Sequence, residues 1–212
     1  TLVARLLPDR WAATAVSGCF FLLCYALVLN KDSATIARSG LRLGGLFEPA
    51  PLNALSMLKA TLVALGWASA LSALVFAPFW VGYVFWWSPQ VPFHPTLGDH
   101  FLEEVLGQVL VVALPEEMFF RGYLQSALDE ARPPRWRILG ANVGFGVLWC
   151  SVIFALGHFT TESNFSRLSV FFPSLVFGWL RARTGGIGAS VFFHAQCNLF
   201  AAFLARSYGL MP

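Results

Sequence analysis

Two adjacent glutamates, Glu116 and Glu117, lie in an apolar stretch of the chain that reads Pro-Glu-Glu-Met-Phe-Phe-Arg at residues 115–121. A carboxylate surrounded by lipid costs several kcal/mol unless it is paired or faces water. A carboxylate in such a place can serve as a general base that takes a proton from water. The two glutamates are therefore the first candidates for a functional site.

Helical geometry gives the two glutamates different surroundings. Glu117 and Arg121 are four residues apart on one helix face, with the acid before the base, so they should form an ion pair. Glu116 points about 140° away from Arg121, because successive residues turn by about 100°. We expect Glu116 to act as a base, while Glu117 is neutralised by Arg121. The alternative is an ion pair that only locks helices together.

Three further polar side chains lie in other apolar segments. His158 ends one of them, and His194 and Asn198 are four residues apart on one face of another. Polar groups at that depth need a shared partner or a cavity. Together with Glu116 they form a set that can activate water and stabilise an oxyanion. The alternatives are an interfacial histidine at position 158 and an interhelical hydrogen-bonded pair at positions 194 and 198.

Several common enzyme motifs are missing from the sequence. It contains no Gly-x-Ser-x-Gly, no phosphate-binding loop and no His-Glu-x-x-His. The four cysteines lack Cys-x-x-Cys spacing, which argues against a disulfide framework or a zinc knuckle. A cysteine protease that uses Cys150 or Cys197 is one rival interpretation. A transporter with a proton-relay glutamate is another, although the chain shows no internal repeat.

The elements that carry these residues are predicted to be membrane-spanning helices. Of the 212 residues, 57% are hydrophobic and 12% are charged, with a mean hydropathy of +0.66. This composition is far from that of a soluble domain. Lipid admits only helices or closed barrels, so we predict an all-α transmembrane bundle of about six spans with a four-helix catalytic core. The spans are expected at residues 11–29, 54–86, 101–125, 138–159, 168–181 and 187–205.

A proline-rich connector at residues 88–95 divides the chain. We expect an N-terminal helix pair with this connector at residues 1–95 and the catalytic core at residues 96–212. Within the core, Pro115 has no amide hydrogen and leaves the carbonyl of Val111 without its helical donor. The helix should kink there, which would give water an entrance.

Positive charge gathers on one face of the predicted bundle. The basic residues on that face are Lys31, Arg38, Arg42, Lys59, Arg132, Arg135, Arg137, Arg181 and Arg183. The positive-inside rule predicts that this face meets the cytosol. The net charge of +3 is too small to indicate nucleic-acid binding, and the basic loops are expected to face anionic lipid.

The order and spacing of these groups resemble the CPBP family of intramembrane proteases, also called the CAAX protease and bacteriocin-processing or Abi family. The matching motifs are Glu-Glu-x-x-x-Arg at residues 116–121, Phe-x-x-x-His at residues 154–158 and His-x-x-x-Asn at residues 194–198. The resemblance covers about residues 100 to 205. The N-terminal spans add nothing to it.

The resemblance implies hydrolysis of a peptide bond within or at the edge of the membrane. Glu116 and His158 would then hold and activate water, and the oxyanion would be bound by His194 and Asn198. The ion pair of Glu117 with Arg121 would organise the first motif, at residues 116–121. The family has been described both as metal-dependent and as glutamate-type. We favour the metal-free form and expect no cofactor, because two histidines and one or two glutamates here form no tight helical ligand pair for zinc.

The implied substrate is a membrane-anchored or hydrophobic protein tail. Family members act on prenylated CAAX termini in eukaryotes, while bacterial relatives are associated with bacteriocin maturation or immunity and with C-terminal sorting tails. A chain this short resembles a bacterial relative, so a multi-pass protein of the bacterial cytoplasmic membrane is expected. The alternative is a non-catalytic binding or immunity protein that uses the same polar cavity. The sequence carries no signal for an oligomeric state.

Overall fold

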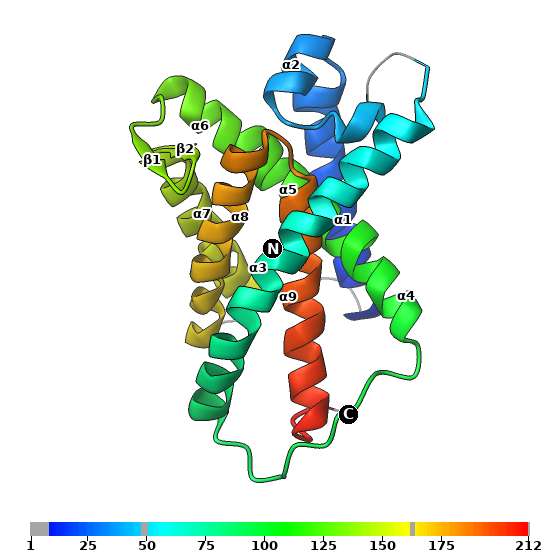
Figure 1. The fold of residues 1–212 in the computed structure, drawn as a ribbon, viewed down its shortest axis with the longest axis vertical. Coiled ribbons are helices and arrows are strands. Elements are labelled where there is room, and N and C mark those ends of the chain that lie inside the picture. Colours follow the sequence, from blue (N-terminus) through cyan, green and yellow to red (C-terminus); the bar gives the residue numbers. More distant parts are fainter. Residues whose placement is uncertain (1–8, 48–50, 162–163, 212) are drawn as a thin grey trace.

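The computed structural model describes residues 9–47, 51–161 and 164–211 of the chain. These residues form a bundle of helices with one small two-stranded hairpin (Figure 1). Three helical segments among them are long and apolar enough to cross a membrane: Trp11–Leu29, Ala54–Trp87 and Gly188–Ser207. The predicted all-α helical bundle is confirmed, and the chain is an integral membrane protein. Three of the six predicted spans, the first, second and sixth, correspond to these segments.

The described helices and strands have the following bounds, in chain order. The α-helices are α1 (Asp9–Cys24), α2 (Ser33–Arg38), α3 (Ala54–Trp87), α4 (Phe101–Leu106), α5 (Leu114–Glu117), α6 (Gln125–Ala131), α7 (Phe145–Thr161), α8 (Phe171–Thr184) and α9 (Gly188–Ser207). The strands are β1 (Trp136–Ile138) and β2 (Ala141–Val143). The π-helical segments are Tyr25–Leu29, Gly107–Ala113 and Met118–Leu124, and the 3-10 turns are Leu43–Gly45 and Phe165–Val170.

Helix α3 is the longest element and crosses the bundle obliquely (Figure 1). Its 34 residues extend over about 51 Å at 1.5 Å per residue, which exceeds the ~30 Å hydrocarbon core of a bilayer. The helix therefore has to tilt. Asn53 caps its start by accepting a hydrogen bond from the Ser56 amide at 3.0 Å. Ser88 ends it in a left-handed conformation, and the proline-rich connector follows.

The third predicted span is one continuous helical stretch, residues 101–131, in which α4, α5 and α6 are joined by π-helical segments. Pro115 lies just after the first of these segments. The Val111 carbonyl, which Pro115 leaves without its amide donor, accepts a hydrogen bond from the Ser17 hydroxyl of α1. The freed carbonyl thus anchors α1 to the stretch that carries the glutamates.

The fourth predicted span starts too early. Residues 136–143 form an antiparallel hairpin of β1 and β2, and α7 begins at Phe145 rather than at residue 138. The turn residues Leu139 and Gly140 have positive φ angles of 46° and 81°, as two-residue hairpin turns require. Hydropathy cannot detect this turn, because Leu139 is as apolar as the helix that follows.

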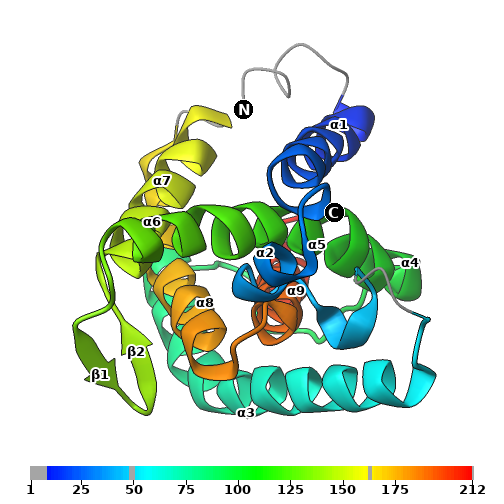
Figure 2. The same cartoon turned by 90° about the horizontal axis from the view of Figure 1, so that it is seen from above.

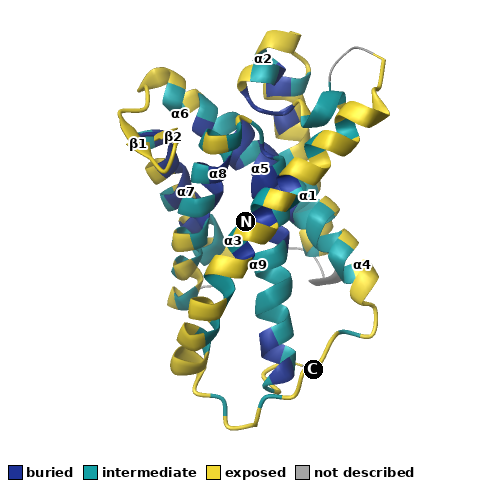
Figure 3. Ribbon diagram, in the orientation of Figure 1, coloured by how far each residue is buried: buried dark blue, intermediate teal, exposed yellow. Residues whose placement is uncertain are grey.

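Helix α9 packs against both α3 and α8 (Figure 2). Small residues allow the close approach, since Ala64 and Ala68 of α3 share one apolar cluster with Phe193 of α9 and with Phe177 and Leu180 of α8. Figure 3 shows that buried residues gather along this centre, whereas much of the outer surface of α3 is exposed. Exposed apolar faces of this kind suit helices that contact lipid.

The N-terminal helices pack directly on the remainder of the bundle. Helix α1 contacts α5 and its two flanking π-helical segments, and α3 packs along α9. Helices α1 and α3 therefore contribute walls to the same bundle that holds the candidate site. The assignment of the catalytic core to residues 96–212 stays a prediction about which segment carries the chemistry.

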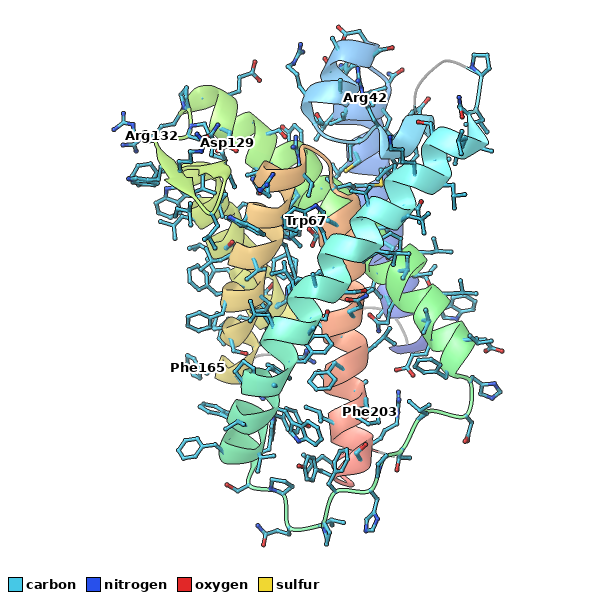
Figure 4. All side chains as sticks on the ribbon, viewed as in Figure 1. Arg42, Trp67, Asp129, Arg132, Phe165 and Phe203 are labelled. Atoms are coloured by element: carbon cyan, nitrogen blue, oxygen red, sulfur yellow. The ribbon has the colours of Figure 1, made fainter. Side chains whose placement is uncertain are left out.

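The basic loops lie together at one end of the bundle. Arg42 and Arg132 are both at that end in Figure 4, while Phe165 lies toward the other. The same end holds α2, the hairpin and the connection from α8 to α9 (Figure 1). By the positive-inside rule, this is the end that we expect to face the cytosol.

Gly146 of α7 leaves space for a carboxylate. A Cβ at this position would lie 2.2 Å from Oδ1 of Asp129. Gly146→Ala is expected to lower the free energy of unfolding by about 1–3 kcal/mol, the usual cost of overpacking. Gly157→Ala on the same helix is the matched control, because a Cβ there meets nothing within 4 Å. Thermal unfolding in detergent compares the two variants, and equal stability would contradict the described packing.

Candidate active site

A fully buried ion pair lies at the centre of the candidate site. Arg121 donates from Nη1 to Oε1 of Glu117 at 2.9 Å, and both side chains have 0% exposure. Its Nη2 donates to the carbonyl and hydroxyl oxygens of Ser174 at 3.1 and 2.5 Å. The guanidinium carbon lies 4.7 Å from the ring centroid of Phe154 and 5.0 Å from that of Phe177. The predicted ion pair is present and is held from several sides.

His194 of α9 connects the two glutamates. Its Nδ1 lies 2.9 Å from Oε1 of Glu117, and its Nε2 lies 3.9 Å from Oε2 of Glu116. A carboxylate only accepts hydrogen bonds, so Nδ1 carries a proton. The ring stacks on Phe177 with centroids 4.8 Å apart and planes at 15°. The gap of 3.9 Å is too long for a direct hydrogen bond, but a water molecule or a substrate atom can bridge it.

Among the described residues, Glu116 forms no ion pair with a lysine or arginine, and its one charge contact is the 3.9 Å approach of His194. Its Oε2 is buried and has no hydrogen-bond partner among the described residues, although the side chain is 15% exposed. Glu116 lines a cavity of about 500 Å³ together with His158. Most of the lining is apolar and includes Val16, Phe20, Val112, Phe119 and Phe154. Glu116 thus faces a cavity, as a general base must if it is to reach water.

His158 lies in the last turn of α7. Its Nδ1 lies 3.0 Å from the carbonyl oxygen of Phe154. A carbonyl oxygen only accepts, so Nδ1 donates and Nε2 keeps its lone pair when the ring is neutral. Figure 2 shows α7 and α1 on the same side of the helical stretch that carries Glu116, and both helices line the cavity. His158 is therefore a fixed proton acceptor on the cavity wall.

Asn198 and His194 lie on one face of α9 but have separate hydrogen-bond partners. The Asn198 Nδ2 donates to Oε1 of Gln108 at 2.9 Å, whereas His194 bonds to Glu117. An amide nitrogen carries two hydrogens. Asn198 can therefore be oriented by Gln108 and still offer a second hydrogen to another group.

Three residues that support the site are not identified from the sequence: Gln108, Ser174 and Ser17. Each is a polar residue within an apolar segment, and each hydrogen-bonds a site residue or the backbone beside it. Their polarity is the available signal, because a polar group at membrane depth needs a partner. Nothing in the spacing of the sequence, however, says which partner each of them takes.

The cysteines proposed for the rival mechanism are poorly placed to act as nucleophiles. The Cys150 thiol is 1% exposed and donates to the Phe120 carbonyl at 3.0 Å. Cys197 packs against an apolar cluster that contains Phe193. A nucleophilic cysteine reacts as the thiolate, whereas a thiol that donates to a carbonyl is held in its neutral form. This arrangement does not favour a cysteine protease.

The described residues do not fit a metal centre. A zinc site of a hydrolase gathers three protein ligands around the ion. Among the described residues, no group of three or more histidine, cysteine, aspartate or glutamate side chains could hold a metal ion. Glu117 is already bonded to Arg121 and His194.

The chain thus carries a glutamate, two histidines and an amide on neighbouring helices of a membrane bundle. Residues 98–200 match a family model described as Rce1-like, type II CAAX prenyl endopeptidase Rce1-like. The match confirms, over this segment, the resemblance to CPBP-family CAAX proteases. The matched segment includes all six predicted site residues but not Ser17. Comparison with curated proteins and with solved structures gives no match.

Proposed function

We propose that the chain is a glutamic-type intramembrane endopeptidase that cleaves near the C-terminal tail of a membrane-associated protein, in the cytoplasmic membrane of a bacterium. The observation that carries the proposal is the placement of Glu116. Its Oε2 lies 3.9 Å from Nε2 of His194, and it shares a cavity with His158. The match to a family of endopeptidases supports the reaction class.

Glu116 activates the water in this proposal. The water gives one proton to the carboxylate while its oxygen forms a bond to the scissile carbonyl carbon. The Nε2 lone pair of His158 accepts a hydrogen bond from the second hydrogen. When the carbon–nitrogen bond breaks, Glu116 returns the proton to the leaving nitrogen. The carboxylate is thereby regenerated, and one water molecule is consumed.

His194 and Asn198 bind the oxyanion that forms on the carbonyl oxygen. In this proposal, Nε2 of His194 donates to the oxyanion while Nδ1 stays bonded to Oε1 of Glu117. Asn198 donates the amide hydrogen that Gln108 does not use. Donors fixed before the reaction contribute most to this kind of stabilisation. Glu117 holds the ring of His194 in place, and Arg121 in turn holds Glu117.

The substrate class follows from the cavity walls. Most of the side chains of α1, α7 and the Glu116 stretch that line the cavity are apolar, while Ser17, Thr161 and Arg167 add polar groups to its wall. An apolar peptide segment that enters from the bilayer can fill such a cavity, whereas a charged soluble peptide would lose its hydration there. A membrane-anchored or hydrophobic protein tail therefore suits the site.

Cleavage by the purified chain in lipid vesicles tests this assignment. The substrates are fluorogenic peptides that end in hydrophobic tails. We expect the Cys150→Ala, Cys197→Ala double variant to keep full turnover, and turnover to persist after treatment with a metal chelator. Zinc that is stoichiometric and required for turnover, or loss of activity in the double variant, would overturn the glutamic-type assignment. Full biological activity of Glu116→Gln would favour a non-catalytic binding protein.

A further inference from the structure

The wall of the Glu116 cavity carries one arginine that the proposed hydrolysis does not use. Arg167 belongs to the 3-10 turn after α7, at Phe165–Val170. Among the described lining residues it is the only lysine or arginine, and Glu116 is the only carboxylate. The charges of both residues act on the ring of His158, so Arg167 lies within electrostatic reach of the proposed reacting groups. A peptide in this cavity therefore meets one fixed negative charge and one fixed positive charge.

Arg167 lies at the end of the cavity that points away from the basic loops. The lining residues of α7 lie at positions 153–161, in the second half of the helix, whereas the start of α7 follows the hairpin at the basic end. Those of α1 lie at positions 12–20, and the chain continues from there toward Lys31 at the basic end. Figure 4 shows Phe165, two residues before Arg167, toward the opposite end. Arg167 is exposed, so an incoming ligand can reach it.

A hydrophobic protein tail brings one charge that it cannot lose, the carboxylate of its last residue, which is ionised at neutral pH. Apolar side chains need no polar partner in the cavity, but a carboxylate that leaves water does. A guanidinium binds a carboxylate through two parallel hydrogen bonds. It has five N–H donors, so Arg167 can keep the contacts that it makes within the chain and still donate to a ligand.

Glu116 excludes the same carboxylate from the other part of the cavity. Two carboxylates that share a poorly hydrated site repel each other, and one of them tends to take up a proton. A tail that placed its terminus beside Glu116 would therefore favour protonation of the group that has to act as the base. The favourable arrangement has the terminus beside Arg167 and an internal carbonyl group beside Glu116. The two charges on the wall thus set the direction of the peptide in the cavity.

We propose that Arg167 binds the free C-terminal carboxylate of the substrate and thereby determines which peptide bond lies beside Glu116. This inference deepens the proposed function and rests on it for the identity of the ligand. The substrate is then recognised by the end of its chain, and a hydrophobic segment far from a chain end is a poor substrate. The terminus enters at the end of the bundle that we expect to face away from the cytosol.

Two peptides with the same hydrophobic tail test the proposal, one with a free carboxylate and the other with a carboxamide at its C-terminus. Fluorescence anisotropy measures their binding to the Glu116→Gln variant in lipid nanodiscs, where turnover does not interfere. We expect the free acid to bind about tenfold more tightly, the value of one charge-assisted hydrogen bond. Adding Arg167→Gln should abolish this preference. Adding Arg167→Lys should keep part of it, because lysine retains the charge but not the two-pronged geometry.

Arg135→Gln, added to the same variant, is the matched control. Arg135 is exposed and lies outside the cavity lining, so the full preference for the free acid should remain. Equal binding of the two peptides, no binding of either, or a preference that survives Arg167→Gln would overturn the proposal.

Cleavage of the same two peptides by the unmodified chain separates this inference from the peptidase assignment. We expect kcat/KM to be about tenfold higher for the free acid, mainly through a lower KM, and equal values would contradict a role of the terminus in recognition. If neither peptide is cleaved while the binding preference and its loss in Arg167→Gln persist, the carboxylate site is supported and the hydrolytic function fails.

Discussion

Glu116→Gln is expected to lower the turnover number of peptide cleavage in vesicles by about 10²- to 10⁴-fold, the usual contribution of a general base. Glutamine has the shape of glutamate but cannot take a proton from water at neutral pH. Because Oε2 of Glu116 has no hydrogen-bond partner among the described residues, the exchange should leave the thermal stability nearly unchanged. The loss should therefore appear in kcat at normal levels of folded protein.

The control for this variant is Glu103→Gln. Glu103 lies on the same helical stretch but at its exposed start, where its side chain is 81% exposed. This variant should keep the turnover of the unmodified chain. If Glu116→Gln kept more than a tenth of that turnover, Glu116 could not be the base.

Arg121→Leu is expected to lower the free energy of unfolding by about 3–5 kcal/mol, because it leaves a buried carboxylate without its counter-ion. Glu117 has 0% exposure and has no water to replace the guanidinium. The variant also removes two hydrogen bonds to Ser174. Adding Glu117→Gln to Arg121→Leu should restore part of the lost free energy of unfolding, because the double variant no longer buries an unpaired carboxylate.

The matched control breaks a less buried ion pair of the same chemistry. Arg206 of α9 pairs with Glu104 of α4, and these two side chains are 16% and 22% exposed. Arg206→Leu should cost less than Arg121→Leu, because water can still reach the partly exposed carboxylate of Glu104. Reversible unfolding of all variants in mixed detergent measures the differences. An Arg121→Leu loss no larger than that of Arg206→Leu would show that the central pair does not organise the site.

The local part of the site could be predicted from the sequence. The pairing of Glu117 with Arg121 needs only the period of the helix, since a four-residue step fixes the shared face. The freed carbonyl of Val111 follows in the same way from the missing amide hydrogen of Pro115. The apolar composition was sufficient for the fold class, because lipid leaves few other solutions.

Contacts between distant segments could not be predicted. His194 bonds Glu117 and approaches Glu116 across 77 or more positions of sequence, and helical periodicity says nothing about which helices are neighbours. Asn198 shows the same limit, because its partner Gln108 lies on another stretch. Hydropathy also misplaced the start of α7, since the hairpin turn at Leu139 is apolar. These features depend on packing and on backbone dihedrals, which neither composition nor spacing encodes.

Mass spectrometry of protein C-termini in the membrane fraction tests the proposed peptidase most directly. Membranes are compared from cells that express the unmodified chain and cells that express Glu116→Gln at equal level. We predict a small set of membrane proteins that have lost their C-terminal tails only when the unmodified chain is present. Identical sets of C-termini in both samples, with both proteins folded in the membrane, would contradict peptide-bond hydrolysis by Glu116.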